Sequence, residues 1–307
     1  MRVLMTTDME GVSQITDHRH CWPAFPEYWR EGRDLYTAEV AAAAAGLLDG
    51  GASAVGIADT HGNGNWHNLF LSNLPDGVEI VGVHARHNDF DASFQLGMHA
   101  RCGTLDGFMS HTHLPRFRMA VDGALITECH EFAWDAGLPL LGVTGEAALE
   151  RELDGGLSGM PFLAVKHSNS RTATTPDSSP TGSIEALRAF ARQCVLHWSE
   201  RPVARPPERF TLEISLDPDL IQHIEPDTGL IRQSAAVAAL SGTDWQRDAQ
   251  PAIRAAFAAA LRPWIATLNG LKVSSEEVML QQNPEKLEHF RNYLTAWMQA
   301  QDESWRV

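Results

Sequence analysis

The chain has 307 residues, 44% of them hydrophobic and 21% charged, which is the composition of an ordinary globular protein. Its formal net charge of −15 leaves no basic surplus to displace counterions from phosphates, so we expect no nucleic-acid partner. No apolar run approaches the roughly 18–20 residues of a membrane span, and no signal peptide is visible, so we expect no membrane association. Four cysteines without CxxC spacing indicate free thiols in a reducing compartment, and we expect a cytoplasmic location.

A short buried strand is predicted over residues 2–7, and two carboxylates, Asp8 and Glu10, follow it at once. If the backbone stays extended there, side chains two residues apart point the same way. Asp8 and Glu10 would then converge at the carboxyl end of the strand, where open α/β sheets keep their ligands. Two like charges held that close require a shared proton or a metal ion.

The next segments complete a βαβ unit and bring a histidine to the same edge of the sheet. An apolar stripe predicts a helix over residues 34–49, and residues 53–58 read as a second buried strand. Strand, helix and strand in this order imply a parallel sheet. The second strand ends in Asp59-Thr60-His61, followed by a Gly/Asn-rich turn, which repeats the arrangement seen after the first strand.

Further strands are predicted at residues 78–83, 93–98, 139–144 and 162–166. The second of these ends in His99, and a short segment over residues 107–110 ends in His111. Asp122 and Gly123 between apolar arms predict a β-hairpin over residues 118–127 with a type I′ turn. Glu128 follows that hairpin and precedes a helix predicted over residues 129–136.

The remaining chain divides at a proline-rich linker. Residues 169–182 read as a loop, Ser183 as the cap of the next helix, and residues 201–207 as the linker. Beyond the linker we expect strands at 209–215 and 230–239, an alanine-rich helix at 250–261 and two helices in the tail. The predicted fold is α/β, with a mostly parallel sheet flanked by helices in residues 1–200, a smaller α+β domain in 201–265 and a helical extension in 266–307.

Carboxylates and imidazoles thus collect at the predicted strand ends. They are Asp8, Glu10, Asp59, His61, His99, His111 and Glu128. Two histidines with three carboxylates can hold two divalent cations, one carboxylate bridging them, and a donor set without thiolate suits zinc or another first-row ion in a catalytic site. Paired metals activate a water and polarise a carbonyl or phosphoryl oxygen. Asp59 is a candidate for orienting an imidazole. Spacing alone leaves the choice of ligands open.

The chain resembles the DppA-type zinc D-aminopeptidases in a series of motifs that occur in the family's order. They are Asp8-Met9-Glu10-Gly11, Gly32-Arg33 with Thr37-Ala38-Glu39, Asp59-Thr60-His61-Gly62 with Asn68-Leu69, Gly97-Met98-His99-Ala100-Arg101, Met109-Ser110-His111-Thr112, and Ala164-Val165-Lys166 followed by Ser170-Arg171-Thr172-Ala173. The match is strong over residues 1–175 and diffuse to about 265, and the last forty residues look like an extension.

The resemblance implies a cytoplasmic dinuclear zinc aminopeptidase with a preference for D-amino acids, assembled into large ring-like homo-oligomers for which a decamer is one option. Carried over by position, Asp8 would bridge two Zn²⁺ ions. Glu10 and His99 would complete one site, and His61 with Glu128 the other. His111 would be the catalytic histidine, which we assign as a general acid/base rather than a nucleophile.

Some residues depart from the family pattern and keep other readings open. The family usually has glycine before the hairpin glutamate and Gly and Asn soon after it, whereas this chain has Thr127-Glu128-Cys129-His130-Glu131-Phe132. A changed specificity, for another small peptide or amide, therefore stays open, and Lys166 or Arg171 could meet a substrate carboxylate. A two-metal phosphoesterase is the second hypothesis. It ranks lower because it would want Asp-x-His at the first strand, where this chain has Asp8-Met9-Glu10, and a later Gly-Asn-His motif, which is missing. A non-catalytic metal-binding oligomeric module is the third hypothesis.

Overall fold

A computed structural model describes residues 1–64, 68–82 and 89–269, together with positions 285, 288, 291, 292 and 295. Its base is a seven-stranded sheet in the order β3-β2-β1-β4-β7-β8-β9. The strands are β1 (Arg2–Thr7), β2 (Ala54–Asp59), β3 (Val78–Ile80), β4 (Ala92–Met98), β7 (Leu140–Glu146), β8 (Phe162–Ser170) and β9 (Ala173–Pro176). Neighbours from β3 to β8 run parallel, and β9 pairs antiparallel at the edge.

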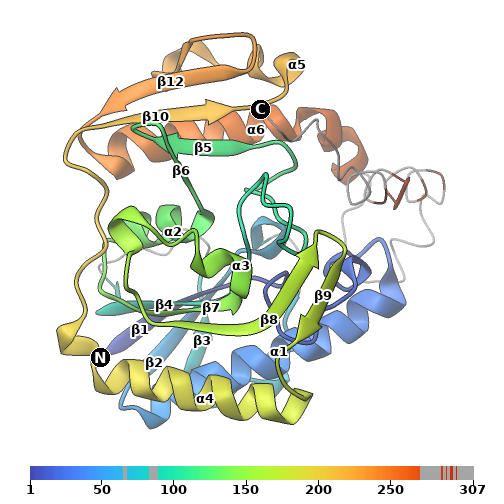
Figure 1. The fold of residues 1–307 in the computed structure, drawn as a ribbon, viewed down its shortest axis with the longest axis vertical. Coiled ribbons are helices and arrows are strands. Elements are labelled where there is room, and N and C mark those ends of the chain that lie inside the picture. Colours follow the sequence, from blue (N-terminus) through green and yellow to red (C-terminus); the bar gives the residue numbers. More distant parts are fainter. Residues whose placement is uncertain are drawn as a thin grey trace.

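Helices cover both faces of this sheet, which is why its central strands are almost continuously buried. On one face lie α1 (Pro26–Asp49) and α4 (Pro180–Leu196), which pack against each other (Figure 1). Val40 of α1 and Leu187 of α4 enter the same core as Met5 and Ile57 of the sheet. This layer fixes the strands, and with them the edge from which Asp8 and His61 project.

The opposite face carries α2 (Glu128–Ala136), α3 (Ala147–Glu150) and a second, antiparallel sheet (Figure 1). This five-stranded sheet has the order β11-β12-β10-β5-β6. Its strands are β5 (Arg118–Val121), β6 (Ala124–Ile126), β10 (Phe210–Ser215), β11 (Ile231–Arg232) and β12 (Val237–Gly242), and α5 (Pro218–Ile221) and α6 (Gln250–Asn269) accompany them. Met98, Trp134, Leu212 and Trp245 share one core, so α2 lies between the two sheets.

The α/β fold class and the βαβ opening are confirmed, and so is the hairpin. Asp122 and Gly123 have φ values of 51° and 80°, the left-handed conformations that a type I′ turn requires. The first helix begins at Pro26 rather than at residue 34, because proline is suited to the first helical position and the side chains of Trp29 and Tyr36 are buried. The two predicted tail helices lie outside the continuously described residues.

The loop predicted over residues 169–182 is partly wrong. The strand β8 extends to Ser170, and β9 pairs with it as an edge strand, a position that tolerates its Pro176. The helix cap is Ser179 rather than Ser183, since the Ser179 hydroxyl oxygen accepts a hydrogen bond from Gly182 N at 3.2 Å. The predicted strand at 230–239 is two strands, β11 and β12, separated by a turn.

The proline-rich segment at 201–207 leads from α4 toward β10. The antiparallel sheet joins β10 to the β5–β6 hairpin, so it takes strands from both sides of that segment. The division into residues 1–200, 201–265 and 266–307 stays a prediction. No helix within the described residues is both long and apolar enough to cross a membrane.

Candidate metal centre

The polar cluster lies at the carboxyl ends of β1, β2 and β4, which are neighbours in the sheet. Close backbone approach draws the ends of β1 and β4 together: Gly11 N donates to Gly97 O at 2.7 Å, and a Cβ on Gly11 would stand 2.0 Å from Met98 O. Gly97 has a φ of 73° and could not carry a side chain without clashing with Asp8 O. The two glycines therefore set the spacing between the carboxylates after β1 and the histidine after β4.

Asp8 is the centre of this cluster. Its Oδ1 lies 3.1 Å from His61 Nδ1, and its Oδ2 lies 3.2 Å from His99 Nε2. Met9 N donates to Asp8 Oδ1 at 2.8 Å, and only 4% of the residue is exposed. The carboxylate therefore lies between two imidazoles that follow two other strands.

Two further carboxylates flank Asp8. Glu10, which is 1% exposed, places Oε2 3.0 Å from His61 Nδ1, so the two acids after β1 do converge. Glu128, at the first turn of α2, places Oε1 3.8 Å from His99 Nε2. Candidate ligand atoms lie within 4.8 Å of one another in two groups, Asp8 with Glu10 and His99, and His99 with His111 and Glu128.

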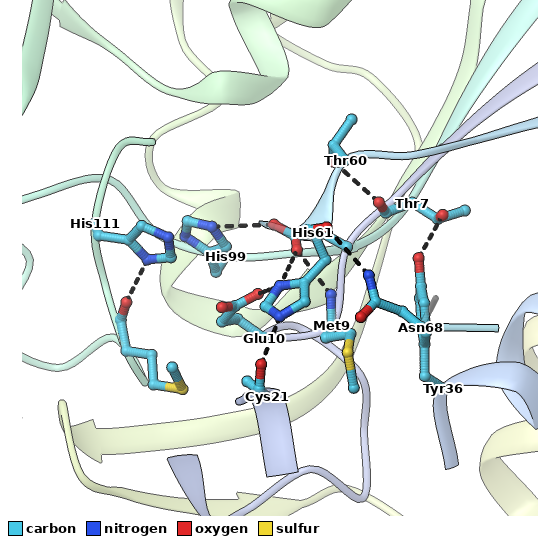
Figure 2. Close-up of polar contacts among 12 residues, drawn as sticks. Thr7, Met9, Glu10, Cys21, Tyr36, Thr60, His61, Asn68, His99 and His111 are labelled. Carbon is cyan, nitrogen blue, oxygen red and sulfur yellow. Dashed lines mark hydrogen bonds and ion pairs between the residues drawn. The ribbon is translucent and has the colours of Figure 1, made fainter. Parts of the chain in front are cut away.

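Backbone carbonyls set the tautomer of all three histidines. His61 Nε2 lies 2.6 Å from Cys21 O (Figure 2). His99 Nδ1 lies 3.0 Å from Ala100 O, and His111 Nδ1 lies 2.7 Å from Met109 O. A carbonyl only accepts, so each of these ring nitrogens carries the proton and donates it. In the neutral rings, the other nitrogen presents a lone pair.

For His61 and His99 that lone pair faces buried carboxylates, an arrangement that repels unless a cation lies between them. Among the described residues, His99 Nε2 has no well-directed hydrogen-bond partner although Asp8 Oδ2 is 3.2 Å away. Metal-ligating histidines characteristically donate their other ring N–H to a carbonyl or carboxylate in this way. The donor set of imidazole and carboxylate therefore fits a divalent metal.

In the metal-free chain, protons on the imidazoles balance the buried carboxylates, and the pKa values of these groups shift in that direction. Burial opposes charge on His99, but Asp8 and Glu128 raise the pKa of His99 to about 10. Burial also opposes charge on His61, but Glu10 and Asp8 raise the pKa of His61 well above its ordinary value. Burial acts against ionisation of Asp8 too, yet His61 and His99 hold the pKa of Asp8 well below normal. Burial, and next to it the charge of Asp8, raises the pKa of Glu10.

His111 differs from the other two histidines. Its ring stacks on that of His99 with centroids 4.1 Å apart and planes inclined by 9°. Burial and the positive charge of His99 hold the pKa of His111 well below its ordinary value. The ring is therefore neutral at neutral pH and can accept a proton.

The residues from Thr127 to Phe132, which depart from the family pattern, form the start of α2 rather than a further set of metal ligands. Thr127 is the N-cap, and its backbone N–H donates to His130 Nδ1 at 3.3 Å. His113 N donates to Glu128 Oε1 at 2.6 Å, and His113 Nε2 pairs with Glu131 Oε2 at 2.6 Å. Helix capping and the His113 contacts together orient Glu128.

Asp59 does not orient an imidazole, which corrects the sequence-based expectation. Its Oδ1 accepts from the backbone N–H of His61 at 3.2 Å and from Tyr36 Oη at 3.0 Å. Asn68 Nδ2 donates to Asp59 Oδ2 at 3.0 Å. Asp59 thus holds the backbone at His61, while the ring is oriented by Cys21, whose carbonyl no sequence pattern marks.

Lys166 and Arg171 are buried against backbone carbonyls, which contradicts the prediction that either one meets a substrate carboxylate. Lys166 is 0% exposed, and its ammonium donates to the carbonyls of Val12 at 3.0 Å and Ile15 at 2.8 Å, and to that of Glu10. Arg171 is buried and donates to Ser110 O at 3.3 Å. Lys166 instead fastens the turn that carries Glu10, because a buried charge must be satisfied by polar groups.

Sequence reasoning also missed Glu146, a buried carboxylate at the end of β7 whose two oxygens accept hydrogen bonds from the loop between His99 and His111. Its sequence signal was the same one that marked Asp8, a carboxylate directly after a buried strand. A parallel sheet with a buried group of carboxylates and imidazoles at its carboxyl edge is the arrangement found in metal-dependent α/β hydrolases, and this site fits that class.

The chain belongs to the D-aminopeptidase family of peptidases, whose family model matches residues 1–223, and it is therefore an enzyme of the hydrolase class. A solved structure described as the Zn-dependent D-aminopeptidase DppA from Bacillus subtilis, a self-compartmentalizing protease, has the same fold. It is 22% identical, aligns with a TM-score of 0.77, and the alignment covers 85% of this chain and 98% of that one. No curated protein matches the chain.

Proposed function

We propose that the protein is a dinuclear zinc aminopeptidase that hydrolyses the N-terminal amide bond of short peptides containing D-amino acids, or of related small amides. One observation carries the proposal. The carbonyls of Cys21 and Ala100 each take one ring N–H of His61 and His99, so that the other nitrogen of each ring, the one free to bind a metal, faces buried carboxylates. Family membership supports amide hydrolysis, and the zinc dependence of the structural neighbour supports zinc as the metal.

We assign Asp8 as the ligand shared by both ions, because its two oxygens face two different histidines. Glu10 and His99 complete one site in this assignment, and His61 and Glu128 the other. The grouping of His111 with His99 and Glu128 makes His111 a competing ligand for the second ion. The metal content of a His111 variant decides between these assignments.

Bound zinc would lower the pKa of a water molecule and polarise the scissile carbonyl. The chain itself supplies the proton transfer. His111 donates Nδ1–H to Met109 O, so Nε2 is the nitrogen that takes a proton and returns it to the leaving amine. Since burial disfavours the charged form and lowers the pKa of His111, the ring starts the cycle in the neutral form that a base requires.

We further propose a large ring-like homo-oligomer, for which the neighbour's description as self-compartmentalizing is the support. A cytoplasmic location fits the four cysteines, all of them free and buried. The substrates we propose are small peptides or amides, with neither nucleic acid nor membrane as partner. The two-metal phosphoesterase gains no support from the family match.

The test is to strip the protein with a chelator, add back zinc and measure amino-acid release from matched D- and L-dipeptides. We expect turnover that depends on zinc and is faster with the D-dipeptide. The metal content of carefully prepared protein is the control. Fewer than one metal per chain, with no turnover of any peptide or amide, would favour the non-catalytic binding module instead.

A further inference from the structure

Glu146 is a fully buried carboxylate at the end of β7, on the side of His99 and His111. Its Oε1 accepts from Ala100 N at 2.9 Å, and its Oε2 accepts from Phe108 N at 2.7 Å and from Ser168 Oγ at 2.8 Å. Burying a carboxylate is costly, and these three donors offset the cost. Glu146 thereby joins both ends of the loop that separates the two histidines.

The backbone of Ala100 links Glu146 to both imidazoles. The N–H of Ala100, in the peptide that follows His99, is held by Glu146. The carbonyl of Ala100, in the next peptide, accepts from His99 Nδ1 at 3.0 Å and from the backbone N–H of His111 at 3.2 Å. Because the two peptides meet at the Cα of Ala100, a shift of this residue would move the acceptor for the His99 ring and for the His111 backbone together. The stacking of the two rings therefore depends on a backbone position that Glu146 holds.

The second oxygen of Glu146 secures the returning arm of the loop. Phe108 N donates to it, and Gly107 leaves room for the approach, since a Cβ at Gly107 would lie 3.1 Å from Glu146 Oε1 and 2.8 Å from Ala100 Cβ. Met109 is the next residue, and its carbonyl accepts from His111 Nδ1 at 2.7 Å. Met109 has a φ of 51°, a conformation unusual for a residue with a side chain.

We propose that Glu146 is a positioning residue of the active site: through Ala100 and Phe108 it sets the tautomer, orientation and stacking of His99 and His111. It touches neither substrate nor metal in this role. The catalytic consequence rests on the function proposed above, but the positioning itself is a property of the metal-free chain. The two are therefore separable by experiment.

Glu39 provides a matched control outside this loop. It is also buried, and its Oε1 accepts from Ser13 N at 3.0 Å and from the Ser13 hydroxyl. Glu152 is unsuitable because it accepts from Arg101 N at 2.8 Å, in the same peptide as the Ala100 carbonyl. A change at Glu39 therefore reports what replacing a buried carboxylate costs the fold without loosening the backbone at Ala100.

The experiment compares Glu146→Gln with Glu39→Gln in the full chain. Both oxygens of Glu146 accept backbone N–H groups, so in Glu146→Gln one of the two faces an amide NH₂ and loses its bond. We expect the ¹⁵N signals of the His99 and His111 rings to shift in chelator-stripped Glu146→Gln, with His167 unchanged as the internal reference. Zinc titration should show affinity about 10–100-fold weaker, as for outer-shell residues generally.

Glu39→Gln should leave the ring signals in place and zinc affinity within about twofold of wild type. Ring signals unaltered in folded Glu146→Gln would overturn the proposal. If that variant does not fold, Ser168→Ala removes one donor to Glu146 and should shift the same two rings less; an unchanged spectrum there overturns it as well. Wild-type protein that binds no zinc would refute the proposed function. The ring signals of metal-free wild type and Glu146→Gln would still show whether Glu146 positions the two histidines.

Discussion

The imidazole rings of His99 and His111 stack with their centroids 4.1 Å apart and their planes 9° apart. Two charged rings at this separation would repel each other strongly. The structure avoids the conflict through different surroundings: Asp8 and Glu128 favour the charged form of His99, whereas burial and His99 itself disfavour the charged form of His111. One imidazole is thus bound to the carboxylate cluster, and the other can exchange protons.

Replacing His111 tests its role in proton transfer. We expect His111→Gln to lower kcat by about 10²–10⁴-fold, the usual contribution of a general acid/base, and to keep the wild-type zinc content. Steady-state kinetics and elemental analysis of the same preparation measure the two effects. His167→Gln, at an exposed histidine, is the control and should change neither. Loss of one zinc in His111→Gln would make His111 a ligand.

Asp8 and Glu10 should differ in how much metal they hold. Asp8→Ala should lose both zinc ions because both oxygens of Asp8 face histidines, while Glu10→Ala should mainly weaken one. Bound zinc per chain after dialysis at a fixed free zinc concentration measures the difference. Equal metal content in the two variants would contradict the division of labour between these acids.

Zinc binding should release protons. At neutral pH the metal-free protein holds protons on His61 and His99, since the pKa of His99 is about 10 and that of His61 is also raised. A metal must displace them, so binding at pH 7 should release about two protons, and apparent affinity should rise with pH until these groups deprotonate unaided. Calorimetry in buffers of different ionisation enthalpy counts the protons. A heat independent of the buffer would rule this out.

Glu39 should make stability depend on pH. Burial raises the pKa of Glu39 from 4.5 to about 7, against hydrogen bonds from Ser13 that lower it. The folded state therefore binds more protons than the unfolded state between these values, and stability falls as the pH rises from about 4.5 to 7. The whole change is on the order of 3 kcal/mol. Denaturant unfolding across this range should show a flatter profile for Glu39→Gln, which keeps the acceptor for Ser13.

The control for that measurement is Glu79→Gln. Glu79 is half exposed and paired with Arg2 at the surface, so its profile should follow that of the wild type. Identical profiles for Glu39→Gln and the wild type would show that Glu39 titrates normally.

Lys166 should be important for stability rather than for substrate binding. Lys166→Met leaves the buried carbonyls of Glu10, Val12 and Ile15 without their donor, which we expect to cost about 3 kcal/mol of unfolding free energy. Arg188→Met is the control, because Arg188 pairs with Asp49 at the surface and should contribute less than about 1 kcal/mol. Equal stability loss in the two variants would refute this role.

Local sequence patterns predicted a large part of this structure. The βαβ opening, the hairpin at Asp122 and Gly123 and the strand ends at Asp8, His61 and His99 follow from periodicity and turn chemistry, which act over a few residues. Boundaries were less accurate: β9 was taken for a loop because its Thr and Pro residues form a strand only by pairing with β8. Pairing between strands depends on tertiary context, which local propensity does not contain.

By itself, the sequence determined which side chains gather at one edge of the sheet, because parallel strands bring their carboxyl ends together wherever the chain carries Asp8, His61 and His99. The tertiary structure decided what each of them can do. The Cys21 carbonyl that sets the tautomer of His61, the enclosure that turns Lys166 into a backbone anchor and the link from Glu146 to two histidines all join residues far apart in the chain. Hydrogen-bond direction and burial arise from packing in three dimensions, and they convert a list of metal-competent residues into a site with fixed protons.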